Sequence, residues 1–168
     1  MSDTTGDFRL VAILNKRVET GKAMNALAHC VAGVTCLAGE PGRAALKFID
    51  FVDFDSLKFP SISARSFIIL RGAEGELRKV HRQACEGKLP AVAFLESMTG
   101  GTYTEQLERT KTTPTAKLSY YAVALVGSAA NVNPITKKYS LWRSDAPAPS
   151  KPVERQIDGL QFTAEEKT

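Results

Sequence analysis

Apolar runs alternate with segments of helical periodicity along the chain. Short apolar and β-branched runs are typical of buried strands, and they predict strands at 8–15, 66–71, 91–95 and 120–127, with part of 45–56 as a further strand. Apolar residues spaced for one helix face predict helices at 23–37 and 73–87. Because the strand runs have few polar interruptions, both faces of the sheet should be covered. The pattern therefore predicts an α/β protein with a small mixed sheet.

The segments between these elements carry the usual signals for turns and helix ends. Thr20 is predicted as the N-cap of the first helix, and Ala38–Arg43, with two glycines and a proline, should end it. No strong period is present from Gly100 to Ser119, so a long loop is expected there. The segment from Asn133 to Arg143 fits either a short helix or a closing strand.

Composition places the chain among ordinary globular proteins. Its 168 residues, 43% hydrophobic and 24% charged, predict one domain over 8–142. The segment 143–168, rich in Pro, Ala, Ser and charge, is predicted to be a largely disordered tail. We find no run of about 20 apolar residues and no secretory leader, so no membrane association and a cytoplasmic location are expected.

Charge and cysteine content exclude only a few kinds of partner and site. The net charge of +4 is compatible with a polyanionic partner such as RNA, but no basic run stands out. Three cysteines without C-x-x-C spacing, Cys30, Cys36 and Cys85, argue against a disulfide scaffold or a zinc site. They are expected to be small buried hydrophobes in a reducing compartment. His81 is expected to be a solvated residue of a charged helix. No cofactor fingerprint or metal-ligand cluster is found, so neither is predicted.

A polar stripe interrupts the apolar first helix. Lys22, Asn25 and His29 are spaced by three and four residues, so they share one helix face. Gly33 continues this face by one turn, where it would allow a backbone or a ligand to approach closely. The stripe has two interpretations: a solvated lysine with a structural amide and a boundary histidine, or the wall of a cleft.

Four segments in order resemble a known family. The first segment consists of Gly21 and Lys22, six further residues and then His29. It resembles the first-helix motif of the type II peptidyl-tRNA hydrolases. Similar resemblances lie at Glu76–Pro90, at "AVALVGSAA" and at "ITKKYSLW", so the resemblance covers roughly 10–142. It implies a four-stranded mixed sheet sandwiched by helices. Because these hydrolases commonly form homodimers, it also implies a homodimer, with the aromatic residues near Phe48 to Phe59 as one possible contact surface.

The chain departs from this family at two positions. The glutamine of the family's helix motif falls on Ala26, although Asn25 beside it offers an amide. The aspartate of the family's Asp-Ala-Gly-x-Thr motif falls on Met98 if Gly100 and Thr102 are matched, and on Glu96 if residues are counted from the Leu-Pro pair. Such departures suit a divergent sister family of uncharacterised bacterial proteins with the same fold.

The resemblance implies a role for each candidate residue. Lys22 would be a cation near the cleaved ester or the phosphates, Glu96 would orient or deprotonate water, and His29 would be a substitute base. Asn25, Thr99 and Thr102 would bind substrate.

Two functions follow: a hydrolase of ester- or amide-linked substrates such as peptidyl-tRNA, or a non-catalytic binding module for an anionic small molecule, a nucleotide or a protein. A carboxylate within hydrogen-bond reach of Lys22 would favour the hydrolase, and Met98 in that place would favour the binding module.

Overall fold

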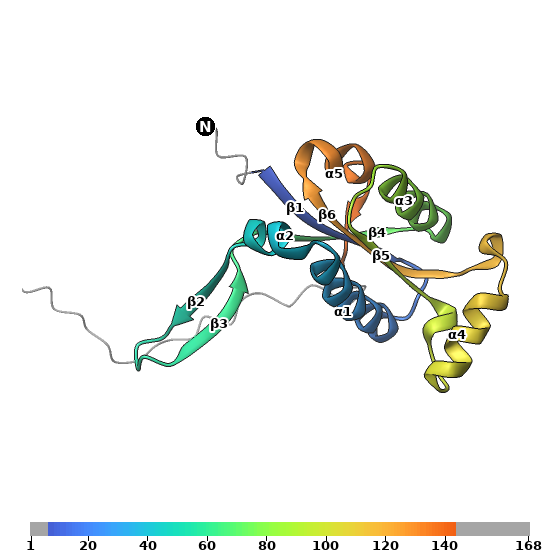
Figure 1. Cartoon of the computed structure of the whole chain (residues 1–168), viewed down its shortest axis with the longest axis horizontal. Helices are drawn as coiled ribbons and strands as arrows, with labels where there is room; N and C mark the ends of the chain where they lie inside the picture. The colour runs from blue at the N-terminus through green and yellow to red at the C-terminus, as the bar shows by residue number, and fades with distance from the viewer. Residues whose placement is uncertain (1–6, 144–168) are drawn as a thin grey trace, which may run out of the picture.

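The computed structural model describes residues 7–143, which form one mixed β-sheet with helices on both of its faces and a separate hairpin (Figure 1). This confirms the α/β class. The sheet has the strand order β5-β6-β1-β4-β7. Its strands are β1 (Phe8–Asn15), β4 (Phe67–Gly72), β5 (Ala91–Leu95), β6 (Tyr120–Ser128) and β7 (Ser140–Leu141). The helices are α1 (Thr20–Leu37), α2 (Gly39–Leu46), α3 (Glu74–Glu86), α4 (Tyr103–Thr112) and α5 (Ala129–Thr136), and the hairpin is β2 (Phe48–Val52) with β3 (Lys58–Ser63).

Strand β1 is the centre of the sheet and of the core. It pairs parallel with β4 and antiparallel with β6, and its residues from Leu10 to Leu14 are all buried. Alternate side chains of a strand point to opposite faces, so β1 contributes to two apolar layers. Leu10, Ala12 and Leu14 pack toward α1, whereas Val11 and Ile13 pack toward α3 and α5. The two-sided burial expected from the apolar runs is therefore confirmed.

The expected count of four strands is one too low. The segment after β6 forms both elements that its sequence allowed, the helix α5 and then the two-residue strand β7 beside β4. A two-residue strand leaves no periodic pattern in the sequence, so its place in the sheet had to come from the structure.

Helix boundaries differ from expectation at both ends of α1. The N-cap is Glu19 rather than Thr20, because the Glu19 carboxylate accepts hydrogen bonds from the backbone N–H groups of Gly21 (2.7 Å) and Lys22 (3.0 Å). At the other end Gly39, with φ of 59°, interrupts the helix, and α2 follows at once. Pro41 lies in the first turn of α2, where a missing N–H costs nothing. Residues 38–43 thus end one helix and begin another.

The predicted loop from Gly100 to Ser119 contains the helix α4, so that prediction is wrong over ten residues. The helix starts with a capping box. The Thr102 hydroxyl accepts from the Glu105 N–H (3.3 Å), and the Glu105 carboxylate accepts from the Thr102 N–H (2.6 Å). A helix with so little apolar periodicity shows itself in the sequence mainly through this cap.

The cysteines and His81 also differ in part from expectation. Cys30 is buried, and burial raises the pKa of its thiol to about 12, but Cys36 and Cys85 are exposed. His81 is half-buried beside Tyr120 rather than solvated. No helix between residues 7 and 143 is both long and apolar enough to cross a membrane. The predicted tail lies outside the described residues, apart from Arg143.

Candidate functional site

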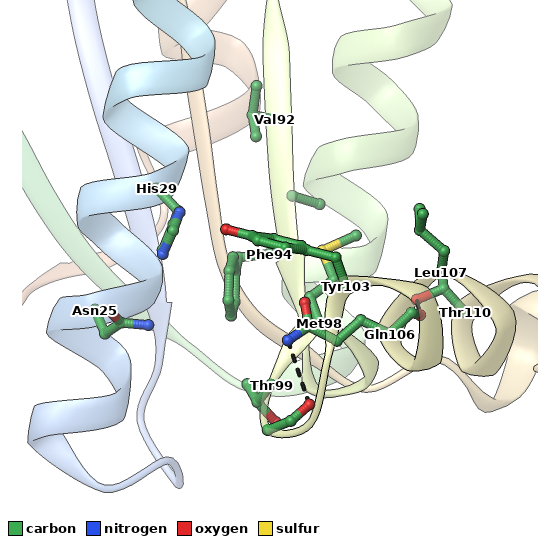
Figure 2. A pocket seen from close by; sticks show the side chains of 12 residues that line it. Asn25, His29, Val92, Phe94, Met98, Thr99, Tyr103, Gln106, Leu107 and Thr110 are labelled. Carbon is green, nitrogen blue, oxygen red and sulfur yellow. Dashed lines mark hydrogen bonds between the residues drawn. The ribbon is translucent and has the colours of Figure 1, made fainter.

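A cleft of about 630 Å³ lies between α1, the edge strand β5 and α4 (Figure 2). Helix α1 contributes Asn25 and His29, and β5 contributes Val92 and Phe94. The opposite wall consists of Met98 and Thr99 with the first turns of α4, including Tyr103, Gln106 and Leu107. The cleft therefore has two apolar aromatic surfaces and an amide on each wall.

The wall formed by α1 carries the polar stripe seen in the sequence. Ala26 and Cys30 face the core, so Asn25 and His29, one position earlier, face outward into the cleft. The His29 ring stacks on Phe94 with ring centroids 5.1 Å apart and an interplanar angle of 23°. Two members of the polar stripe, Asn25 and His29, thus line a cleft, whereas Lys22 is exposed outside the lining.

Gly33 sets the distance between α1 and the edge strand. A Cβ atom at this position would lie 3.2 Å from a methyl group of Val92. The close approach predicted for Gly33 is therefore an approach of β5, rather than of a ligand. It brings Phe94 within stacking distance of His29 and fixes one side of the cleft.

The wall formed by α4 has no buried residue and is attached by polar contacts. Arg109 donates from Nε to the Ser97 carbonyl (3.1 Å) and from Nη2 to the carbonyls of Thr99 (2.9 Å) and Gly100 (3.1 Å). The Thr110 hydroxyl lies 2.8 Å from the Ser97 hydroxyl. These contacts bind α4 to the loop after β5, which turns through two glycines of positive φ, Gly100 and Gly101.

The structure brings three of the six predicted site residues together. Asn25, His29 and Thr99 all line the cleft. Thr102 lies at its margin and is engaged in capping α4, where its hydroxyl lies 3.0 Å from a Glu105 carboxylate oxygen. Exposed Lys22 is one turn before Asn25 on α1 and does not contribute to the lining.

Glu96 and Met98 occupy different places. Glu96 is exposed and lines a separate hollow of about 330 Å³, together with Arg109 and Lys117. Met98 lines the cleft itself. None of the ion pairs between residues 7 and 143 joins Lys22 to Glu96. The carboxylate that was considered for water activation therefore has no contact with the lysine.

The two threonine hydroxyl groups in the cleft are already hydrogen-bonded. The Thr99 hydroxyl donates to the Glu96 carbonyl (2.6 Å), and the Thr110 hydroxyl donates to the Gln106 carbonyl (2.8 Å). Neither hydroxyl is paired with a base. A nucleophile needs such a partner for activation, so the cleft contains binding groups but no assembled nucleophile.

Sequence reasoning missed the residues that come from β5 and α4. Phe94 lies in an apolar run that predicts a core strand, and it is indeed buried, so the pattern carries no sign that its ring also lines a cleft. Tyr103 lies within the Thr102–Glu105 capping box and Gln106 directly after it, and this box would have predicted the helix that carries them.

A second hollow lies on the opposite face of β5, lined by Arg78, His81 and Tyr120 among others, with a volume of about 510 Å³. Burial lowers the pKa of His81 and raises that of Tyr120. Arg78 donates to the Leu118 carbonyl (2.7 Å) and pairs with Glu74 (3.3 Å). Across residues 7–143, no three side chains of the metal-ligating types gather into a site.

Comparisons with known proteins establish the family but not an activity. Residues 8–143 match the family described as "Protein of unknown function (DUF2000)", and the chain belongs to this family. It is similar to the solved structure of the protein of unknown function Atu0240 from Agrobacterium tumefaciens strain C58. The TM-score is 0.69 and the sequence identity 18%, over 82% of this chain and 98% of that one. This likeness extends to the fold alone. No curated protein matches the chain.

Proposed function

We propose that the cleft between α1, β5 and α4 binds a nucleotide and that the protein acts through binding rather than hydrolysis. The observation that carries the proposal is the lining itself. It combines ring surfaces with amides on both walls, and none of its twelve residues is a carboxylate. Met98, rather than Glu96, lies in the cleft, which is the arrangement expected of a binding module.

The aromatic residues provide a surface for a nucleobase. The exposed His29 ring stacks on Phe94, which is itself only 8% exposed, and Tyr103 lies opposite on α4 with 80% of its surface exposed (Figure 2). Stacking on aromatic side chains is worth roughly 1–3 kcal/mol per base and tolerates every base. The exposed ring of Tyr103 keeps apolar surface in contact with water, which is unfavourable. A flat ligand stacked on the ring would remove this surface from water.

The amides and the lysine suit the remaining parts of a nucleotide. Asn25 and Gln106 each carry a donor and an acceptor, which can match the hydrogen-bonding edge of a base. Lys22, exposed and on the same face of α1 as Asn25, lies where a phosphate could extend out of the cleft. A single lysine contributes a modest, salt-dependent attraction to phosphate.

Calorimetric titration with AMP, GMP, CMP and UMP tests this proposal. We expect at least one to bind and Tyr103→Leu to weaken it about tenfold, which corresponds to about 1.4 kcal/mol of lost stacking. Asn25→Ala should weaken it and change the preference among the four bases. Lys22→Gln should weaken it only at low salt, whereas Lys79→Gln, an exposed lysine on α3, is the matched control. Absence of binding by all four at millimolar concentration contradicts the proposal.

A hydrolase remains the second candidate because one observation favours it: His29 is exposed in the cleft and could take a proton from water. The test is turnover of purified peptidyl-tRNA by wild type, Lys22→Ala, His29→Ala and Glu96→Gln. We expect no turnover above the blank. Turnover that His29→Ala abolishes would replace binding by hydrolysis. Turnover lost in both Lys22→Ala and Glu96→Gln would mean that these residues meet in the complex.

A further inference from the structure

The hairpin β2–β3 exposes its apolar side chains on both faces. It projects from the body of the protein (Figure 1), and every residue of its two strands except Ser63 is exposed. Isolated two-stranded hairpins are at best marginally stable in water, and stable ones have a covered apolar face. Eight large apolar side chains are uncovered here: Phe48, Ile49, Phe51, Val52, Phe54, Leu57, Phe59 and Ile62.

One face of the hairpin is continuous and uncharged. Ile49 lies opposite Ile62, and Phe51 lies opposite Phe59. Ile49 and Phe51 are two residues apart, so these two cross-strand pairs share a face. We call these four residues the apolar face. Val52 and Lys58 lie across from each other on the opposite face, as does Asp50, whose carboxylate accepts a hydrogen bond from the Ser61 N–H (3.2 Å).

Hydrogen bonds hold the hairpin at its foot and at its turn, and its apolar face is exposed among residues 7–143. At its foot the Ser63 hydroxyl donates to the Leu46 carbonyl (2.8 Å), and the Arg65 Nε donates to the Ala45 carbonyl (3.1 Å). At its turn the Leu57 N–H donates to the Asp53 carboxylate (2.8 Å). These contacts fix the two ends of the hairpin, and a cover over the apolar face would stabilise the strands between them.

From these observations we infer that the apolar face is the interface of a two-fold symmetric dimer in which the hairpins of two copies of this chain pack face to face. A two-fold contact uses the same patch on both copies, and an uncharged face of paired Ile and Phe residues is self-complementary. The inference does not depend on what the cleft binds.

The exposed area is sufficient for such a contact. The apolar face, together with Phe54 and Leu57 in the turn, exposes on the order of 600 Å² of side-chain surface at about 200 Å² per fully exposed aromatic residue. With the polar atoms around them, this approaches the roughly 800 Å² that each partner contributes to a standard interface. Pairing of strands edge to edge is disfavoured along β3, because Pro60 lacks an N–H and Ser61 forms a bulge with φ of 61°.

Charge sets the relative direction of the two hairpins. The turn end carries Asp53, Asp55 and, at the start of β3, Lys58, so its net charge is negative, and the foot carries the exposed Lys47. If the two hairpins run antiparallel, the acidic turn of each copy lies against the basic foot of the other. A parallel arrangement would bring the two acidic turns together, which like-charge repulsion disfavours.

Sedimentation equilibrium of the full chain from 1 to 100 µM tests the dimer. We expect a mass of twice 18.2 kDa at the upper concentrations. Phe51→Ser and Ile62→Ser should each raise the dimer dissociation constant at least tenfold, whereas Val52→Ser, on the opposite face, should change it less than threefold. Because all three side chains are exposed in the single chain, the circular dichroism spectrum should stay unchanged.

A charge swap tests the antiparallel arrangement. Asp55→Lys and Lys47→Glu should each weaken the dimer several-fold at low salt, and the double variant should recover most of the loss. A monomer at 100 µM overturns the inference. So does a dimer that is insensitive to both Phe51→Ser and Ile62→Ser, or a mass that grows without limit as the concentration rises.

Discussion

The two helices that form the walls of the cleft are attached to the protein in opposite ways. Helix α1 buries Ala23, Ala26, Leu27, Cys30 and Val34 against the sheet. Helix α4 buries no residue, and its Leu107 is 72% exposed. It is connected to the body by hydrogen bonds from Arg109 and Thr110 to the loop after β5.

This difference implies two levels of stability within one site. Local opening costs least where few apolar contacts are lost and where hydrogen bonds are exposed to water. Helix α1 should therefore open only when the whole domain unfolds, whereas α4 should open on its own. A ligand that touches both walls would be positioned by α1 and enclosed by α4.

The same substitution on the two walls gives the largest contrast. Leu27→Ala removes a buried side chain and should lower the free energy of unfolding by about 2–5 kcal/mol. Leu107→Ala removes an exposed one and should change it by less than about 0.5 kcal/mol. Urea denaturation followed by circular dichroism measures both. Equal losses of unfolding free energy would mean that α4 belongs to the cooperative core, as α1 does.

Gly33→Val tests how closely α1 is fitted to β5. The new side chain would meet the Val92 methyl groups, and such overpacking should cost about 1–3 kcal/mol of unfolding free energy. Gly75→Val on α3, where a Cβ meets nothing within 4 Å, is the control for the helix propensity of valine. If both variants lose the same unfolding free energy, the contact with Val92 adds nothing to the cost of Gly33→Val.

Arg109→Ala should release α4 and leave the rest of the domain unchanged. The variant loses three hydrogen bonds to the backbone of residues 97–100, so amide hydrogen exchange in 103–112 should accelerate about tenfold or more, while exchange in β1 and β6 stays constant. The thermal midpoint should fall by no more than a few degrees, since less than about 1 kcal/mol of global stability is involved. Unchanged exchange in α4 would show that other contacts hold the helix.

The smallest predicted effect concerns pH and the far face of β5. Burial lowers the pKa of His81 below its ordinary value near 6.5, so the unfolded chain binds a proton at a higher pH than the folded chain does. The contribution of His81 to stability is therefore complete above about pH 6.5 and is lost as the pH falls through the folded pKa. His81→Gln should flatten this part of the stability profile, measured by urea denaturation between pH 5 and 8. An unchanged slope would assign the pH dependence to other groups.

Much of the sheet and one wall of the cleft could be predicted from the sequence. Four apolar runs correspond to β1, β4, β5 and β6; the apolar character is clearest in β1 and β6, which are buried along most of their length. The spacing of Asn25 and His29 placed them on one face of α1, because helix periodicity fixes that relation independently of tertiary structure.

The second wall could not be predicted in the same way. Helix α4 has no apolar face to bury, so hydrophobic periodicity carries no information about it. The positions of Glu96 and Met98 depend on a short 3-10 turn and on the two glycines after it, which no pattern of residue types specifies. The choice between the two alignments of the carboxylate therefore required the structure.

The placement of β1 between β4 and β6 has a consequence for synthesis on the ribosome. Phe8 pairs with Ser128, so the central strand of the sheet waits for a partner made more than a hundred residues later. At a translation rate of about 5–20 residues per second, that wait lasts on the order of ten seconds. During this time the central strand has no antiparallel neighbour, and the domain can close only after β6 has emerged. Formation of the sheet is therefore delayed until nearly the whole of the described domain has been synthesised.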